Sequence, residues 1–106
     1  LFDIVNCTEV GEHIDPEYCN IFMDNLVGLT NKYLIISWSW EDIHNGASDP
    51  NHQHINALQK GDFYNKMKEF NFVQNIELTD KLRECCKKYH APVWYVNNAI
   101  SIWELK

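Results

Sequence analysis

Two carboxylates and an imidazole stand close together in CTEVGEHID, residues 7–15, directly after a short apolar run. Glu9, Glu12 and His13 are spaced i, i+3 and i+4, and on a helical turn these positions lie on one face. Carboxylate oxygens with one imidazole suit Mg²⁺, Mn²⁺ or Zn²⁺ better than ions that prefer thiolates. The alternative is a solvated acidic first turn that favours the helix dipole, with His13 an ordinary surface residue.

A second group of histidines follows in NHQHIN, residues 51–56. In extended backbone, His52 and His54 point to the same side, so both could ligate a metal, or one could act as a general base near neutral pH. The alternative is two loop histidines in water. If this loop folds back over the first cluster, one of these histidines supplies a metal ligand from a second segment.

The aromatic stretch SWSW has two interpretations. Trp38 and Trp40 fall on the same side of a strand as Leu34 and Ile36, which favours core packing. At the end of a strand, an aromatic ring can instead form the wall of a ligand pocket. Phosphate-cradling loops are not indicated, because the four glycines are scattered and form no GxGxxG pattern.

The elements that position these residues follow from the apolar patterning, which alternates between strand and helix periods. This order predicts an α/β domain with a parallel-type sheet and right-handed crossovers. A polar loop, residues 41–56, separates the second strand from the second helix. We expect strands at 1–7, 32–40, 71–78 and 97–106, and helices at 15–29, 58–70 and 79–90.

Several details of these elements are also predicted. Asp15 should cap the first helix with Pro16 at its first position, and Thr79 should cap the third helix. The strand at 32–40 is nearly all apolar, which is typical of a central strand covered on both faces. The buried faces of the first two helices are expected to be Tyr18, Phe22, Leu26 and Leu29, and Phe63, Met67 and Phe70.

Composition narrows the class of protein. A chain of 106 residues with 45% hydrophobic residues suits one domain with a sizeable core. A net charge of -6 argues against a general binder of phosphate backbones and fits a divalent-cation site, although local lysine clusters leave a basic patch open. The four cysteines form no CxxC pair, so we expect reduced thiols in a cytoplasmic protein, with Cys7 and Cys19 packing in the core.

The start of the chain and its apolar runs give further expectations. The sequence has no apolar run long enough for a transmembrane helix and no signal-peptide pattern. It lacks an initiator Met, and Leu1 opens directly into a strand pattern. We therefore expect a single partial domain, residues 1–106, cut from a longer protein.

Taken in order, FDIVNCTEVGEHI, YLIISWS, HQHIN, FYNKMKEFNF and WYVNNAISIWELK resemble the carboxyl-terminal half of a class I S-adenosylmethionine-dependent methyltransferase. The resemblance covers essentially the whole chain but only about half of the family's domain. It is most specific in D-x-V-x-x-x-E-V-x-E-H, which is similar to the ubiquinone-pathway O-methyltransferases. The matching residues are Asp3, Val5, Glu9, Val10, Glu12 and His13.

This resemblance implies a partial Rossmann-like sheet. The four strands would be strands four to seven of seven, with the last strand antiparallel and the last two paired as a hairpin interrupted by residues 79–90. The family's Gly-rich loop and the acidic residue after strand two hold most of the cofactor and are missing here. The chain alone is therefore expected to bind the methyl donor weakly and to leave FDIVN, residues 2–6, as an apolar edge.

The resemblance also implies a function and a site. The function is transfer of a methyl group from S-adenosylmethionine to an acceptor hydroxyl, chiefly on a small molecule or RNA, with protein side chains and sugars also open. No DNA or membrane partner is expected. A divalent metal such as Mg²⁺ would lower the pKa of that hydroxyl. The alternative is a non-catalytic module that binds metal or completes a partner's sheet. The implied metal ligands are Glu9, Glu12, His13 and His54, with Glu12 and His13 as catalytic residues, Asn6, Cys7 and Thr8 near the cofactor, and Trp38, His44 and His52 near the acceptor.

Overall fold

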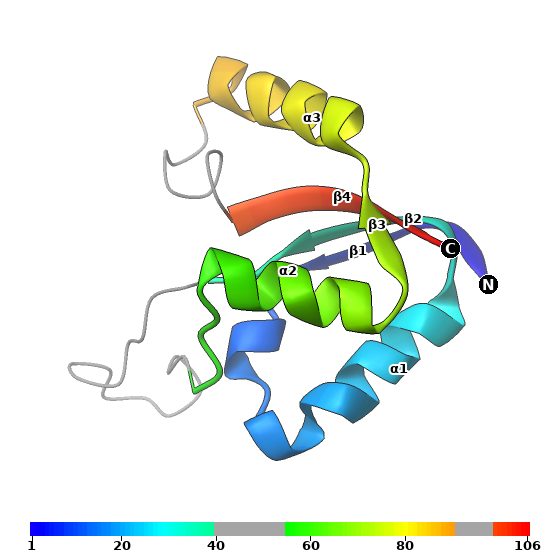
Figure 1. Cartoon of the computed structure of the whole chain (residues 1–106). Coiled ribbons are helices and arrows are strands. Elements are labelled where there is room, and N and C mark those ends of the chain that lie inside the picture. The colour runs from blue at the N-terminus through cyan, green and yellow to red at the C-terminus, as the bar shows by residue number, and fades with distance from the viewer. Residues whose placement is uncertain (40–54, 91–98) are drawn as a thin grey trace.

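The computed structural model describes residues 1–39, 55–90 and 99–106, in which four strands form one sheet with helices on both sides (Figure 1). Two short 3-10 helices link the first strand to the first α-helix. In chain order the elements are β1 (Phe2–Thr8), η1 (Gly11–His13), η2 (Pro16–Tyr18), α1 (Cys19–Leu29), β2 (Thr30–Ser37), α2 (Lys60–Glu69), β3 (Phe72–Gln74), α3 (Ile76–Lys88) and β4 (Ile100–Leu105).

The sheet is mixed, with its described strands in the order β1-β2-β4-β3. β1 and β2 are parallel, whereas β4 runs antiparallel to both β2 and β3. The parallel-type sheet expected from the alternation of elements is therefore right only for the first pair. The expected α/β class is confirmed at this level, as are an antiparallel last strand and the pairing of the last two strands around an intervening helix.

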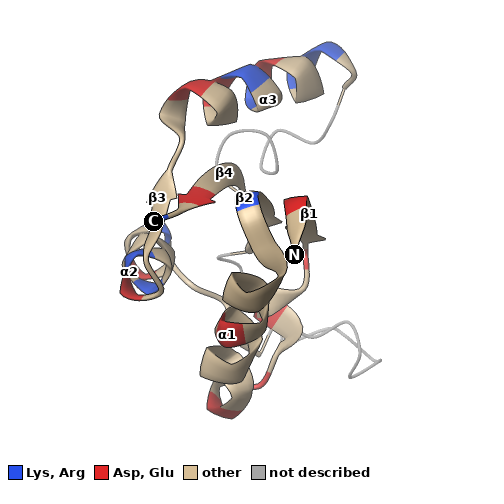
Figure 2. Ribbon diagram, turned by 90° about the vertical axis from the view of Figure 1, so that its right-hand side faces the viewer, with Lys and Arg blue, Asp and Glu red and all other residues tan. Residues whose placement is uncertain are grey.

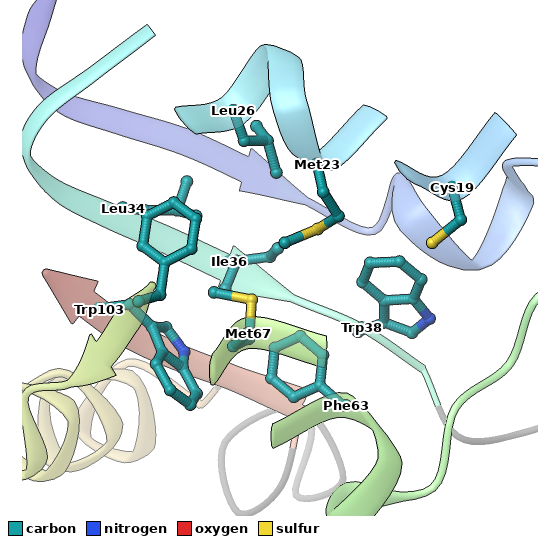
Figure 3. Close-up of a cluster of buried hydrophobic side chains, with 10 residues drawn as sticks. Cys19, Met23, Leu26, Leu34, Ile36, Trp38, Phe63, Met67 and Trp103 are labelled. Carbon is teal, nitrogen blue, oxygen red and sulfur yellow. The ribbon is translucent and has the colours of Figure 1, made fainter. Parts of the chain in front are cut away.

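The core lies between one face of the sheet and helices α1 and α2, while α3 packs against β4 on the other side (Figure 2). Figure 3 shows Met23 of α1 and Met67 of α2 close to Ile36 of β2. Trp103 of β4 belongs to the same cluster and is 1% exposed. The side chains at 34 and 36 lie on this face because alternate strand residues share a face.

The buried face of α1 differs from the expectation. Asp15 caps the 3-10 helix η2 rather than the α-helix, with its side chain accepting a hydrogen bond from the Glu17 N–H at 3.0 Å. Because η2 takes up one turn, α1 begins at Cys19, and the spacing that faces the sheet becomes 19, 23 and 26. Tyr18 and Leu29, which were expected inside, are 53% and 44% exposed.

The third helix starts earlier than expected, so the strand predicted at 71–78 ends at Gln74. Asn75 caps α3, its side chain accepting from the Leu78 N–H at 2.9 Å. Thr79, expected as the cap, is instead buried inside the helix. Its hydroxyl accepts from the Ile102 N–H at 2.9 Å, which fastens α3 to β4.

β1 lies at an edge of the described sheet and carries exposed apolar side chains. Phe2 and Ile4 are 61% and 62% exposed, whereas Val5 and Cys7 point the other way and pack against the core. The apolar edge expected at FDIVN is therefore present. β2 is central, as expected, with Leu34 fully buried on the core face. Its opposite face is only partly covered.

Candidate functional site

The chain turns sharply as it leaves β1. Glu9 has a φ of 57°, a left-handed conformation that non-glycine residues adopt uncommonly. Its backbone N–H donates to the Ser37 hydroxyl at the end of β2 at 2.8 Å. The helical turn expected to carry residues 9, 12 and 13 is therefore wrong, because the 3-10 helix η1 contains only Gly11–His13. We call residues 9–13 the Glu12 turn.

The turn drives the Glu12 side chain into the protein. Glu12 is 0% exposed, and no described residue donates a hydrogen bond to either of its carboxylate oxygens. The solvated acidic turn considered from the sequence is thus wrong for this residue. Burying a carboxylate without donors or an opposite charge is costly, so such groups in folded proteins are usually paired or bound to a metal. Glu12 is the side chain in this region that most needs a ligand.

Backbone contacts from the chain entering α2 hold the Glu12 turn in place. The Glu12 carbonyl accepts two hydrogen bonds, from the N–H groups of Ile55 at 2.9 Å and Asn56 at 3.0 Å. The Asn56 carbonyl accepts in turn from the indole N–H of Trp38 at 2.8 Å. The Trp38 ring also covers Gly11 so closely that a Cβ there would overlap it. We call these contacts the Trp38–Asn56 clamp.

The interpretation of Trp38 as a core residue is confirmed. Trp38 is 3% exposed and belongs to the hydrophobic cluster that contains Leu34 and Ile36. Its ring lies 5.9 Å from Phe22 and 5.8 Å from Phe63, measured between centroids. The Trp38 ring thus packs against the Glu12 turn from the core side. Trp40 lies outside the described residues.

The three residues expected near the cofactor divide between the two faces of β1. Cys7 lies on the core face opposite Ile36, whereas Asn6 and Thr8 lie on the other face. Burial and, secondarily, the nearby Glu12 carboxylate raise the pKa of the Cys7 thiol. Of these three residues, Cys7 is therefore the one that packs against the core.

The structure assembles only part of the predicted metal site. His13 is half-buried in the Glu12 turn, with its backbone N–H bonded to the Val10 carbonyl at 3.0 Å. Among the described residues, no three His, Cys, Asp or Glu side chains gather closely enough to hold a metal ion. The predicted His44, His52 and His54 lie outside the described ranges.

Sequence reasoning missed the residues that fix the turn. Ile55 and Asn56 act through backbone groups, which carry no residue-type signal. Gly11 was visible inside EVGEH, and a glycine permits close approach by another group. The four cysteines are free thiols, as expected, and Cys19 is buried in the core.

Comparison with known proteins gives no relative for this chain: no protein-family model, curated protein or solved structure matches it. In the described parts of the chain, no helix is both long and apolar enough to cross a membrane.

Proposed function

We propose that this chain is the carboxyl-terminal half of an S-adenosylmethionine-dependent methyltransferase domain, which transfers a methyl group to an acceptor hydroxyl with a divalent cation bound at Glu12. The observation that carries the proposal is the Glu12 carboxylate, fully buried without a described donor and directly after β1. In open α/β sheets, ligands bind beyond the carboxyl ends of the strands, and the Glu12 turn occupies that place.

The sheet supports the proposal in two further ways. The family that the sequence resembles implies a last strand that is antiparallel and paired with its predecessor, and β4 has both properties. The family also implies further strands beyond β1, and the edge of β1 is open with Phe2 and Ile4 exposed. An apolar strand edge of this kind is normally covered or blocked by charge.

The donor atoms of the Glu12 turn fit a hard cation only in part. Two carboxylate oxygens of Glu12 that lack hydrogen-bond donors are hard ligands of the type that Mg²⁺ or Mn²⁺ prefers. Glu9 and His13 flank Glu12 in the same turn, and His54 follows in the sequence one residue before the clamp. Glu9, Glu12 and His13 do not gather closely enough in the described structure to hold an ion together, so the proposal rests on Glu12 as the buried ligand.

Each part of the chain then has a defined role in the proposed reaction. The bound cation would act as a Lewis acid that lowers the pKa of the acceptor hydroxyl. Glu12 would fix the position of that charge, and Asn6, Cys7 and Thr8 would border the methionine part of the methyl donor. His13 would stand beside the acceptor oxygen, and Trp38 would hold the turn from the core side. Catalysis would come mainly from alignment of the acceptor oxygen with the methyl group.

A second candidate is a non-catalytic module that completes the sheet of a partner. The observation that favours it is the open edge of β1, where Asp3 is the single charged side chain between residues 2 and 8 and already accepts from the Asn31 amide at 2.8 Å. Such an edge can pair with a strand of another chain whether or not Glu12 binds a cation.

One experiment separates the two candidates. The 106-residue chain and the same chain joined to its natural upstream coding sequence are compared for transfer of a labelled methyl group to hydroxyl acceptors, with and without Mg²⁺. We expect transfer from the joined protein only, lost in Glu12→Ala while the fold is kept. An upstream sequence without a strand and Gly-rich turn, or a joined protein that does not bind S-adenosylmethionine, would exclude the methyltransferase and leave the partner-completing module.

A further inference from the structure

We propose that Trp38 and Asn56 are positioning residues for Glu12: they hold its turn so that the buried carboxylate stays directed at its ligand. The inference rests on the ligand site proposed above and deepens it, because it identifies what fixes that site in place. It starts from the backbone contacts of the clamp, which join three segments that are far apart in the sequence.

The Glu12 turn has little means of holding itself. It contains the 3-10 helix η1 of only three residues, which has no side-chain cap at its amino end. Two backbone hydrogen bonds close this helix, from the His13 N–H to the Val10 carbonyl at 3.0 Å and from the Ile14 N–H to the Gly11 carbonyl at 3.1 Å. Helices this short are not stable alone. The conformation of the turn must therefore come from its surroundings.

The carboxylate itself opposes this conformation. A buried charged group without donors costs at least about 1–3 kcal/mol, and rotation of the turn toward water would remove that cost. An empty Glu12 site would therefore open unless another interaction kept it closed. The two N–H groups of Ile55 and Asn56 on the Glu12 carbonyl supply such an interaction, because they fix the backbone next to the charged side chain.

Trp38 is well placed to anchor the clamp. The backbone N–H of Trp38 donates to the Ala99 carbonyl at 3.1 Å, which ties Trp38 to the residue directly before β4. The indole N–H then fixes Asn56, and the indole ring closes over Gly11, while the Asn56 amide reaches the Gly11 carbonyl at 3.5 Å. Trp38, directly after β2, and residues 55–56, before α2, thus both hold the Glu12 turn.

The test replaces the indole of Trp38 by a ring that cannot donate. Trp38→Phe keeps an aromatic ring over the turn and removes the hydrogen bond to Asn56. Trp103→Phe is the matched control, because Trp103 is equally buried and its indole N–H donates to the Ser101 hydroxyl at 2.7 Å, away from the Glu12 turn. Asn56→Ala, which removes only the side-chain contact, serves if Trp38→Phe does not fold.

Three measurements are made on the full chain: Mn²⁺ affinity by electron paramagnetic resonance, amide exchange at Ile55 and Asn56, and the ¹³C shift of the Glu12 carboxyl. Loss of a group that orients a metal ligand typically weakens binding about 10–100-fold. We expect that loss in Trp38→Phe, with faster exchange at the two amides and a Glu12 shift that moves toward that of exposed Glu17. Trp103→Phe should change none of the three, and Asn56→Ala should weaken Mn²⁺ binding several-fold.

The outcomes keep this inference separate from the proposed function. If Trp38→Phe leaves the amide exchange and the Glu12 shift like those of Trp103→Phe, the positioning role is overturned even when Mn²⁺ binds. If the natural chain binds no Mn²⁺, the proposed cation site fails. In that case the exchange and shift data still decide whether Trp38 and Asn56 hold Glu12.

Discussion

Replacing Glu12 by Gln should stabilise the chain when no cation is present. The carboxylate is 0% exposed and neither oxygen receives a described hydrogen bond, so the folded state carries an unsatisfied charge that the unfolded state exposes to water. Glutamine has nearly the same shape but no charge. The substitution therefore removes much of the burial cost with little change in packing.

The size of the effect follows from the cost of an unsatisfied buried group. That cost is about 1–3 kcal/mol and is larger for charged groups. In a domain of this length, 1 kcal/mol shifts the melting temperature by about 4–8 °C. The buried amide of glutamine would also lack partners, so the substitution removes only the extra cost of the charge. If that extra cost is about 1 kcal/mol, Glu12→Gln should melt about 4 °C higher than the natural chain when both are unfolded in EDTA and followed by circular dichroism.

Added Mn²⁺ should reverse the order. A ligand present at a hundred times its dissociation constant stabilises the folded state by about 2.7 kcal/mol, and only the natural chain should gain this. Glu17→Gln is the control, since it makes the same chemical change at an exposed position in the neighbouring turn and should alter neither melting curve. A Glu12→Gln variant less stable than the natural chain in EDTA would show that the carboxylate has donors, and the reasoning would be wrong.

Three other predictions test the surroundings of the site. Because the pKa of Cys7 is raised, iodoacetamide at mildly alkaline pH should label Cys7 more slowly than exposed Cys85. The folded chain also holds the Cys7 thiol proton more tightly than the unfolded chain, so the free energy of unfolding should fall as pH rises above the ordinary thiol pKa. Cys7→Ala should reduce this pH dependence in urea titrations. Gly11→Ala should cost about 1–3 kcal/mol in urea unfolding, because its Cβ has no space, whereas Gly28→Ala in an open helical position should gain about 0.4–1 kcal/mol. Ile4→Lys should reduce self-association of the isolated chain in sedimentation velocity and change stability by less than about 0.5 kcal/mol, since Ile4 is already exposed; unchanged association would place the contact elsewhere.

The fold was predictable where the apolar pattern was strong. An apolar run such as YLIIS is buried best in the middle of a sheet, and β2, which contains it, lies between β1 and β4. Boundaries failed where local chemistry competed with the pattern. Asn75 is as good a helix cap as Thr79 and lies one turn earlier, so α3 begins before the predicted strand has ended. The direction of β4 came from resemblance, because strand patterning contains no information on parallel or antiparallel pairing.

The candidate site was predictable in its residue types and not in its geometry. Spacing alone put Glu9, Glu12 and His13 on one helical face, but that required a helix beginning at residue 9. A left-handed Glu9 breaks the helix and separates the three residues into different environments. The contacts that hold the Glu12 turn come from Trp38 and Asn56, which are 26 and 44 residues further along the chain than Glu12. No local pattern contains such a contact.

Three departures from local rules lie together at the end of β1. A left-handed glutamate, a glycine without room for a methyl group and a buried carboxylate without donors all occur within residues 9–12. Each departure costs free energy, and a natural sequence tolerates such costs mainly where function requires them. Near α3, Thr79 satisfies β4 and Asn75 caps its helix, although His90 also has a positive φ and one buried nitrogen of Arg83 has no described partner. The concentration of these costs within residues 9–12 supports the proposed ligand site at Glu12.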